Sequence, residues 1–153
     1  MLTHVEMRII CYDWDDPSKI EKRILDLLKG INIKEIFFEK KVGKGLVSSE
    51  LICYRVKLDK RKHIDIFLKN FLEKLDKEEI EKILKEIDKI VDDEGKLYLR
   101  FDKDYFIIKG KLKFVNHGEV LHITLTPKLY KKDREEAKEL FKNLLNKNSL
   151  SSI

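Results

Sequence analysis

Apolar and polar residues alternate with a period of two along the first stretch of the chain. Between residues 3 and 12 every second residue is apolar, beginning with Val5 and ending with Cys11. This period is typical of a strand that is buried on one side. Asp16 then precedes Pro17, and an N-cap aspartate followed by a proline at the first helical position predicts a helix that ends near Gly30.

The remaining pattern predicts three helices and five strands. Strands are expected at 34–41 and 47–58, around the turn-forming residues 42–45, then as a pair within 95–114 that splits near 102–104, and finally at 119–126. Helical spacing marks residues 64–75, residues 76–91 with a capping-box-like Asp76 and Glu79, and a last helix capped by Asp133. The order β-α-β-β-α-α-β-β-β-α predicts an α+β domain over residues 1–148, with a flexible tail at 149–153. We expect a largely antiparallel or mixed sheet with helices on one face.

Composition limits the class of protein. The chain has 153 residues, of which 42% are hydrophobic and 40% charged, which suits one globular domain with a charged exterior. No apolar run approaches the roughly 18 residues of a membrane helix, and the N-terminus lacks the features of a signal peptide, so we expect a cytoplasmic protein. The absence of Gln, and a single alanine at Ala137, favour a thermophilic source.

Charge is distributed unevenly along the chain. Residues 64–95, which form the two central helices, carry 6 basic and 11 acidic side chains, whereas residues 34–63 carry 9 and 4, and residues 96–132 carry 9 and 3. If helices cover one face of the sheet, the positive charge is concentrated on the other face and its loops.

A more specific prediction comes from residues 95–114, which read GKLYLRFDKDYFIIKGKLKF. Strand parity places Lys96, Tyr98 and Arg100 on one face of the first predicted strand. The same rule places Lys109, Lys111 and Lys113 on one face of the second, with Leu97, Leu99, Ile108, Leu112 and Phe114 directed into the core. Basic side chains around a tyrosine suit the phosphates and unstacked bases of RNA. A solvated face whose lysines protect a sheet edge from aggregation explains the pattern equally well.

Catalytic and metal-binding groups are sparse. The acidic loop at Asp13, Asp15 and Asp16 favours a helix cap over a divalent-cation site. The four histidines lack the spacing of a zinc site, and Cys11 and Cys53 are expected as reduced, non-nucleophilic thiols. Trp14 either anchors the helix start or stacks on a base. We therefore predict no enzymatic activity, no cofactor and no metal.

The segment DEGKLYLRFDK at 93–103, followed by GKL at 110–112, resembles the signature of an archaeal RNA-binding family described as predicted exosome subunits. That family is similar in fold to the large-subunit ribosomal protein that holds 5S ribosomal RNA. By matching position, the resemblance implies that Arg100 and Lys103 contact phosphates, with Asp102 orienting Arg100. An alternative is that Asp102 caps the turn and Arg100 is a salt-bridged strand residue.

These inferences predict a non-catalytic RNA-binding protein, related to RNA processing or the exosome. Its predicted RNA contacts are Lys44, Lys96, Tyr98, Arg100, Lys103, Lys109, Lys111 and Lys113. The competing hypothesis is a protein–protein adaptor of an RNA-processing complex, which docks through the acidic helices at 64–95 or a free sheet edge. Besides RNA, the partners to consider are exosome or ribosome-related proteins and a second copy of the chain. No membrane is expected.

Overall fold

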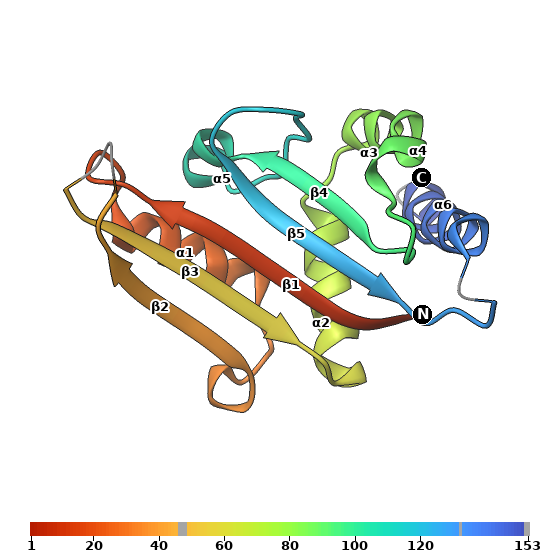
Figure 1. Cartoon of the computed structure of the whole chain (residues 1–153), viewed down its shortest axis with the longest axis horizontal. Coiled ribbons are helices and arrows are strands. Elements are labelled where there is room, and N and C mark those ends of the chain that lie inside the picture. The colour runs from red at the N-terminus through yellow and green to blue at the C-terminus, as the bar shows by residue number, and fades with distance from the viewer. Residues whose placement is uncertain (46–48, 132, 152–153) are drawn as a thin grey trace.

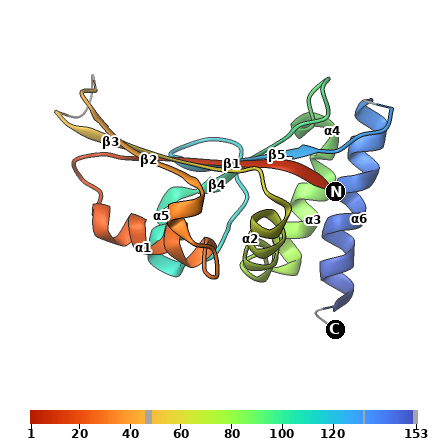
Figure 2. The ribbon, with the colours of Figure 1, turned by 90° about the horizontal axis from the view of Figure 1, so that it is seen from below.

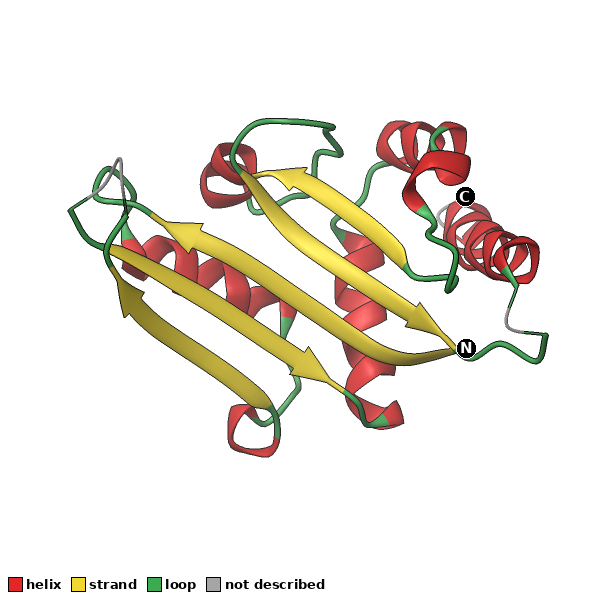
Figure 3. Cartoon of the chain, in the orientation of Figure 1, coloured by secondary structure: helices red, strands yellow, loops and turns green. Residues whose placement is uncertain are grey.

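One antiparallel sheet of five strands organises the chain (Figure 1, Figure 3). The computed structural model describes residues 1–45, 49–131 and 133–151. The spatial order is β2-β3-β1-β5-β4, with no parallel pair among the described strands. The strands are β1 (Leu2–Cys11), β2 (Phe37–Gly43), β3 (Leu51–Leu58), β4 (Leu97–Asp102) and β5 (Val120–Pro127). The predicted α+β class and antiparallel sheet are confirmed.

The helices lie on one side of this sheet, as predicted. Their bounds are α1 (Pro17–Leu27), α2 (Arg61–Glu73), α3 (Lys77–Lys85), α4 (Ile87–Ile90), α5 (Lys103–Lys109) and α6 (Arg134–Ser151), with a 3₁₀ turn at Ile33–Glu35. Figure 2 shows the sheet from its edge, with α1, α2, α3 and α5 below it and α6 at one end. None of the helices in the described ranges has the length and apolarity needed to cross a bilayer.

Strand alternation explains which face the helices cover. On β1, the apolar residues Val5, Met7 and Ile9 are at most 2% exposed and belong to one continuous core. The core face of β5, with Leu121, Ile123 and Leu125, is equally buried. Because successive side chains point to opposite faces, the residues between them lie on the side that the helices leave open.

Two of the three predicted helix caps are present. The Asp16 carboxylate accepts a hydrogen bond from the Ser18 amide, and that of Asp133 accepts one from the Glu136 amide. The predicted capping box of Asp76 and Glu79 is wrong. Asp76 makes no side-chain cap, and Glu79 accepts a hydrogen bond from the Phe114 amide, which ties α3 to the segment beside β4.

The prediction of a second strand through Lys109–Lys113 is also wrong. The chain enters α5 directly after β4, because the Asp102 carboxylate accepts a hydrogen bond from the Tyr105 amide at 2.8 Å and caps the helix. Gly110 ends α5 with φ +70°, in the left-handed region that favours glycine. Ile108, which was expected in the core, is consequently 69% exposed. Only an isolated bridge between Phe101 and Phe114 pairs the following segment with β4.

Two chain boundaries also differ from the pattern. The predicted strand at 47–58 is described as β3 from Leu51 onwards, and its first two residues lie outside the described part of the chain. Helix α6 continues to Ser151. Helical backbone therefore extends into the expected tail at 149–153, whose last two residues also lie outside the described ranges.

Candidate nucleic-acid interface

The uncovered face of the sheet carries a row of cationic side chains. Backbone register sets Arg8 of β1 opposite Arg55 of β3 on one side and opposite His122 of β5 on the other. His122 is in turn opposite Arg100 of β4. We call Arg55, Arg8, His122 and Arg100 the arginine row. It crosses four of the five strands in a single line.

Such a row is electrostatically unfavourable in an isolated protein, because like charges opposite each other on adjacent strands repel. Arg55 is partly compensated, since its Nη2 lies 3.0 Å from Oε1 of Glu6 and Glu39 faces it across β2. Within the described residues, no carboxylate lies at ion-pair distance from Arg8 or Arg100. Arg100 donates only a long hydrogen bond of 3.4 Å to the Asn116 carbonyl. The centre of the row therefore retains uncompensated positive charge.

The surroundings of His122 in this row favour its neutral form. Burial is the main cause that lowers the pKa of His122 below its ordinary 6.5, and the charges of Arg8 and Arg100 lower it further. A neutral imidazole can donate one hydrogen bond and accept another between the two guanidinium groups. The row thus offers several donors to an anion, and an anion would relieve the repulsion between its members.

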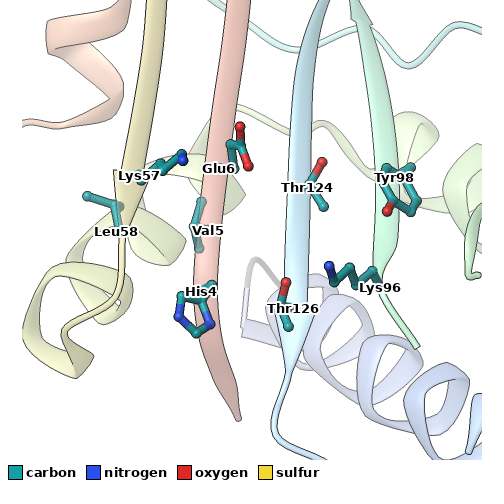
Figure 4. A pocket seen from close by; sticks show the side chains of 9 residues that line it. All are labelled: His4, Val5, Glu6, Lys57, Leu58, Lys96, Tyr98, Thr124 and Thr126. Atoms are coloured by element: carbon teal, nitrogen blue, oxygen red, sulfur yellow. The ribbon is translucent and has the colours of Figure 1, made fainter. Parts of the chain in front are cut away.

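A hollow lies beside the arginine row on the same face (Figure 4). Its volume is about 500 Å³, and strands β1, β3, β4 and β5 and the residue before β4 provide its polar lining, namely His4, Glu6, Lys57, Lys96, Tyr98, Thr124 and Thr126. A smaller depression of about 230 Å³ joins it to the row, lined by Glu6, Arg8, Tyr98, His122 and Thr124. At the β3 end of the face, Lys57 Nζ lies 5.1 Å from the centre of the Phe37 ring.

Three residues predicted to contact RNA lie on this face. Tyr98 is 47% exposed, Arg100 is exposed, and Lys96 is half-buried with its ammonium 3.7 Å from the Glu94 carboxylate. Burial and a hydrogen bond to Asp92 raise the pKa of Tyr98 above its ordinary value. The predicted pairing of Asp102 with Arg100 is not seen, because Asp102 caps α5. The capping alternative for Asp102 is confirmed.

Lys103 does not lie on the open face. It is 1% exposed, and its ammonium contacts Oδ2 of Asp15 at 2.6 Å, Oε1 of Glu119 at 3.1 Å and the Ile10 carbonyl at 3.2 Å. The Tyr12 ring covers it at 4.7 Å. The structure therefore corrects the predicted exposed phosphate contact to a buried ion pair. It also gives Asp15, in the acidic loop, a structural role.

The remaining predicted lysines are separated from the row. Lys109 is the last residue of α5, Lys111 lies 3.5 Å from Asp76, and Lys113 Nζ lies 5.7 Å from the centre of the Tyr105 ring. The predicted alignment of these three on one strand face is wrong, because the chain there forms a helix and a turn. Lys44 is exposed in the loop that follows β2.

The sequence pattern missed Arg8, Arg55 and Lys57 as members of one surface. Strand alternation already placed Arg8 on the polar side of its strand, which was the available signal. Their alignment depends on the register between strands that are distant in sequence. Across the described ranges, no group of three His, Cys, Asp or Glu side chains is arranged to hold a metal ion.

A sheet covered by helices on one side and lined with arginines on the other has the geometry of a nucleic-acid-binding domain. The family model described as "RNA binding" matches residues 4–127, so the chain belongs to this RNA-binding family. The RNA-binding part of the predicted resemblance is thereby confirmed.

Individual relatives support the same family and fold. The chain is 23% identical over 133 residues to the RNA-binding protein PAB1135 of Pyrococcus abyssi, a match that covers 86% of each protein. It superposes on Mth689, a DUF54 protein of Methanothermobacter thermautotrophicus, with a TM-score of 0.74 and 23% identity, over 95% of this chain and 98% of the other. SSO0741 of Sulfolobus solfataricus gives a TM-score of 0.70 and 25% identity, over 90% and 96%.

Proposed function

We propose that the chain is a non-catalytic RNA-binding protein whose open sheet face holds the RNA backbone through Arg8, Arg55 and Arg100. This proposal is based on the arginine row. The fold alone gives no reason to align like charges across adjacent strands, since their repulsion reduces stability. A polyanion removes that repulsion and releases counterions on binding.

The planar guanidinium group suits this role. It donates paired hydrogen bonds to phosphate oxygens, and the row presents three such groups on a rigid sheet. A row in one line can follow successive phosphates of one strand. Lys57 and Lys96 lie on the same face, on the side of the row where the hollow lies, and extend the positive charge in that direction.

The experiment is a measurement of RNA affinity for the double variant Arg8→Ala/Arg100→Ala over a range of salt concentrations. Hydrogen bonds to charged groups contribute about 1.5–3 kcal/mol each, so affinity should fall about 100-fold or more. The slope of log affinity against log salt should decrease by about 1 for each arginine removed.

The matched control is Lys69→Ala/Lys85→Ala. It removes the same charge from exposed positions on α2 and α3, on the helical side of the molecule. We expect its affinity and salt slope to change little. Equal losses in the two double variants would mean that RNA responds to net charge, and the proposed face would be rejected. Intact RNA after prolonged incubation with the protein is expected if its role is non-catalytic.

Association with the exosome or with ribosome-related proteins stays a prediction, as does the likeness to the 5S-RNA-binding ribosomal protein. The adaptor hypothesis has one favourable feature, the outer edge of β2, which the sheet order leaves without a neighbouring strand in the described part of the fold. A pulldown with and without ribonuclease separates the two roles, since only partners held by protein contacts survive digestion.

A further inference from the structure

The hollow beside the arginine row combines an aromatic wall with polar groups. Tyr98 of β4 provides the aromatic ring, while Thr124 and Thr126 of β5 and His4 of β1 provide hydroxyl and imidazole groups (Figure 4). Its volume of about 500 Å³ lies within the range of about 300–1,000 Å³ that is common for sites holding a small organic group.

The Tyr98 hydroxyl lies near the turn that precedes β4, where burial raises its pKa and the charges of Asp92 and Glu94 contribute to that rise. The Asp92 carboxylate accepts hydrogen bonds from the amides of Glu94 and Lys96, each at 2.9 Å. Because Tyr98 is 47% exposed on a paired strand, its ring is accessible to a flat group that approaches from the open face.

Register relates the hollow to the arginine row. Thr124 faces both Glu6 and Tyr98 across neighbouring strands, and this line of residues is the next one along the same face after Arg8, His122 and Arg100. Two residues along a strand span about 6.7 Å. A nucleotide whose phosphate lies on the row can therefore extend its base towards the hollow.

We propose that this hollow is the subsite for one unpaired base, and that the RNA bound by this face is single-stranded or looped. The inference rests on the proposed function. The bases of an RNA duplex are stacked within the helix and cannot enter a hollow of this kind, whereas bases in single strands and loops can turn outwards and stack on aromatic side chains. The threonine hydroxyls and His4 can meet the polar edge of such a base, since each can donate or accept a hydrogen bond.

The test compares a single-stranded RNA with a duplex of the same length and sequence, bound to the wild type and to Tyr98→Ala. Base–aromatic stacking predicts a loss of about 5- to 150-fold in affinity for the single strand and little change for the duplex. Tyr98→Phe keeps the ring and should retain most of the affinity. Tyr105→Ala, a tyrosine on α5 at the helical side, is the matched control and should leave both affinities unchanged.

A fluorescent base analogue within the single strand provides a second measurement that needs no variant. Its emission should be quenched when the wild type binds, at one position of the oligonucleotide. A free nucleoside monophosphate should compete weakly, because it contacts only one part of the row. Competition as strong as that of the oligonucleotide would overturn the assignment in favour of a mononucleotide site.

The failure of this inference can be told apart from failure of the proposed function. If Arg8→Ala/Arg100→Ala abolishes binding while Tyr98→Ala leaves the affinity for the single strand unchanged, the row binds RNA and the base subsite is rejected. Equal losses for single strand and duplex in Tyr98→Ala would also reject it. If neither variant loses affinity, both proposals are overturned.

Discussion

Lys103 and Asp15 form a buried ion pair, with 2.6 Å between Nζ and Oδ2, that connects the start of α5 to the loop before α1. Glu119 completes the cluster from the segment that leads into β5. Three regions distant in sequence thus meet at one ammonium group. Lys103, the last residue of the DEGKLYLRFDK segment, therefore has a structural explanation that is independent of RNA.

We expect Lys103→Ala to destabilise the fold. Removing one partner of a buried ion pair leaves uncompensated charge in a poorly solvated place, which typically costs about 3–5 kcal/mol. Urea unfolding measures the change in stability. The control is Lys113→Ala, which removes an exposed lysine from the segment after α5 and should cost far less stability. A Lys103→Ala protein of unchanged stability but weakened RNA binding would restore the original prediction of a phosphate contact.

His122 should make stability and RNA binding depend on pH in opposite ways. Its folded pKa lies below 6.5, so the unfolded chain binds more protons just below pH 6.5. The contribution of His122 to stability should therefore decrease as the pH falls from about 6.5, and level off once the pH is below the folded pKa. A phosphate on the row would instead favour the imidazolium form, so RNA affinity should rise with acidification.

Proton NMR of the imidazole in free and RNA-bound protein checks this prediction directly. The pKa of His122 should increase when RNA binds, and His122→Asn should remove the corresponding part of the pH dependence of affinity. A His122 pKa that is the same in both states would mean that phosphates do not reach the arginine row.

Gly95 should not tolerate a side chain. Its φ of +87° disfavours other residues, and an added Cβ would lie 2.7 Å from Cδ1 of Leu129 and 3.1 Å from Cβ of Ala137. Gly118 has a similar φ of +93° but open space around it. Thermal unfolding should therefore show Gly95→Ala to be less stable than Gly118→Ala by about 1–3 kcal/mol, the usual cost of overpacking. If both substitutions cost the same stability, backbone strain alone would explain why glycine is needed at position 95.

Much of the fold follows from short-range patterns. The strand β1, its buried residues and the Asp16 cap of α1 were all predicted, because strand period and N-cap chemistry act between residues close in sequence. The seven-residue helix α5 was not predicted. A single short helix gives too few turns for a clear apolar period, and the lysines that recur at every second residue from Lys109 to Lys113 imitate a strand.

The candidate site was predicted in part for the same reason. Tyr98, Arg100 and Lys96 were placed on the open face by parity within one strand, whereas the lysines at 109–113 were misplaced along with the wrong strand. Lys103 shows the clearest limit. A basic residue in sequence is expected in solvent, and only its distant partners Asp15 and Glu119 explain its burial.

The sequence by itself determined an α+β domain with acidic helices, basic strands and one polar face on each strand, because these properties depend on local periodicity and composition. The tertiary structure alone decided that Arg55, Arg8, His122 and Arg100 lie in one row and that Tyr98 borders a hollow beside it. The physical reason is strand register. It is set by the packing of the whole core, and a shift of one residue would turn every one of these side chains to the opposite face.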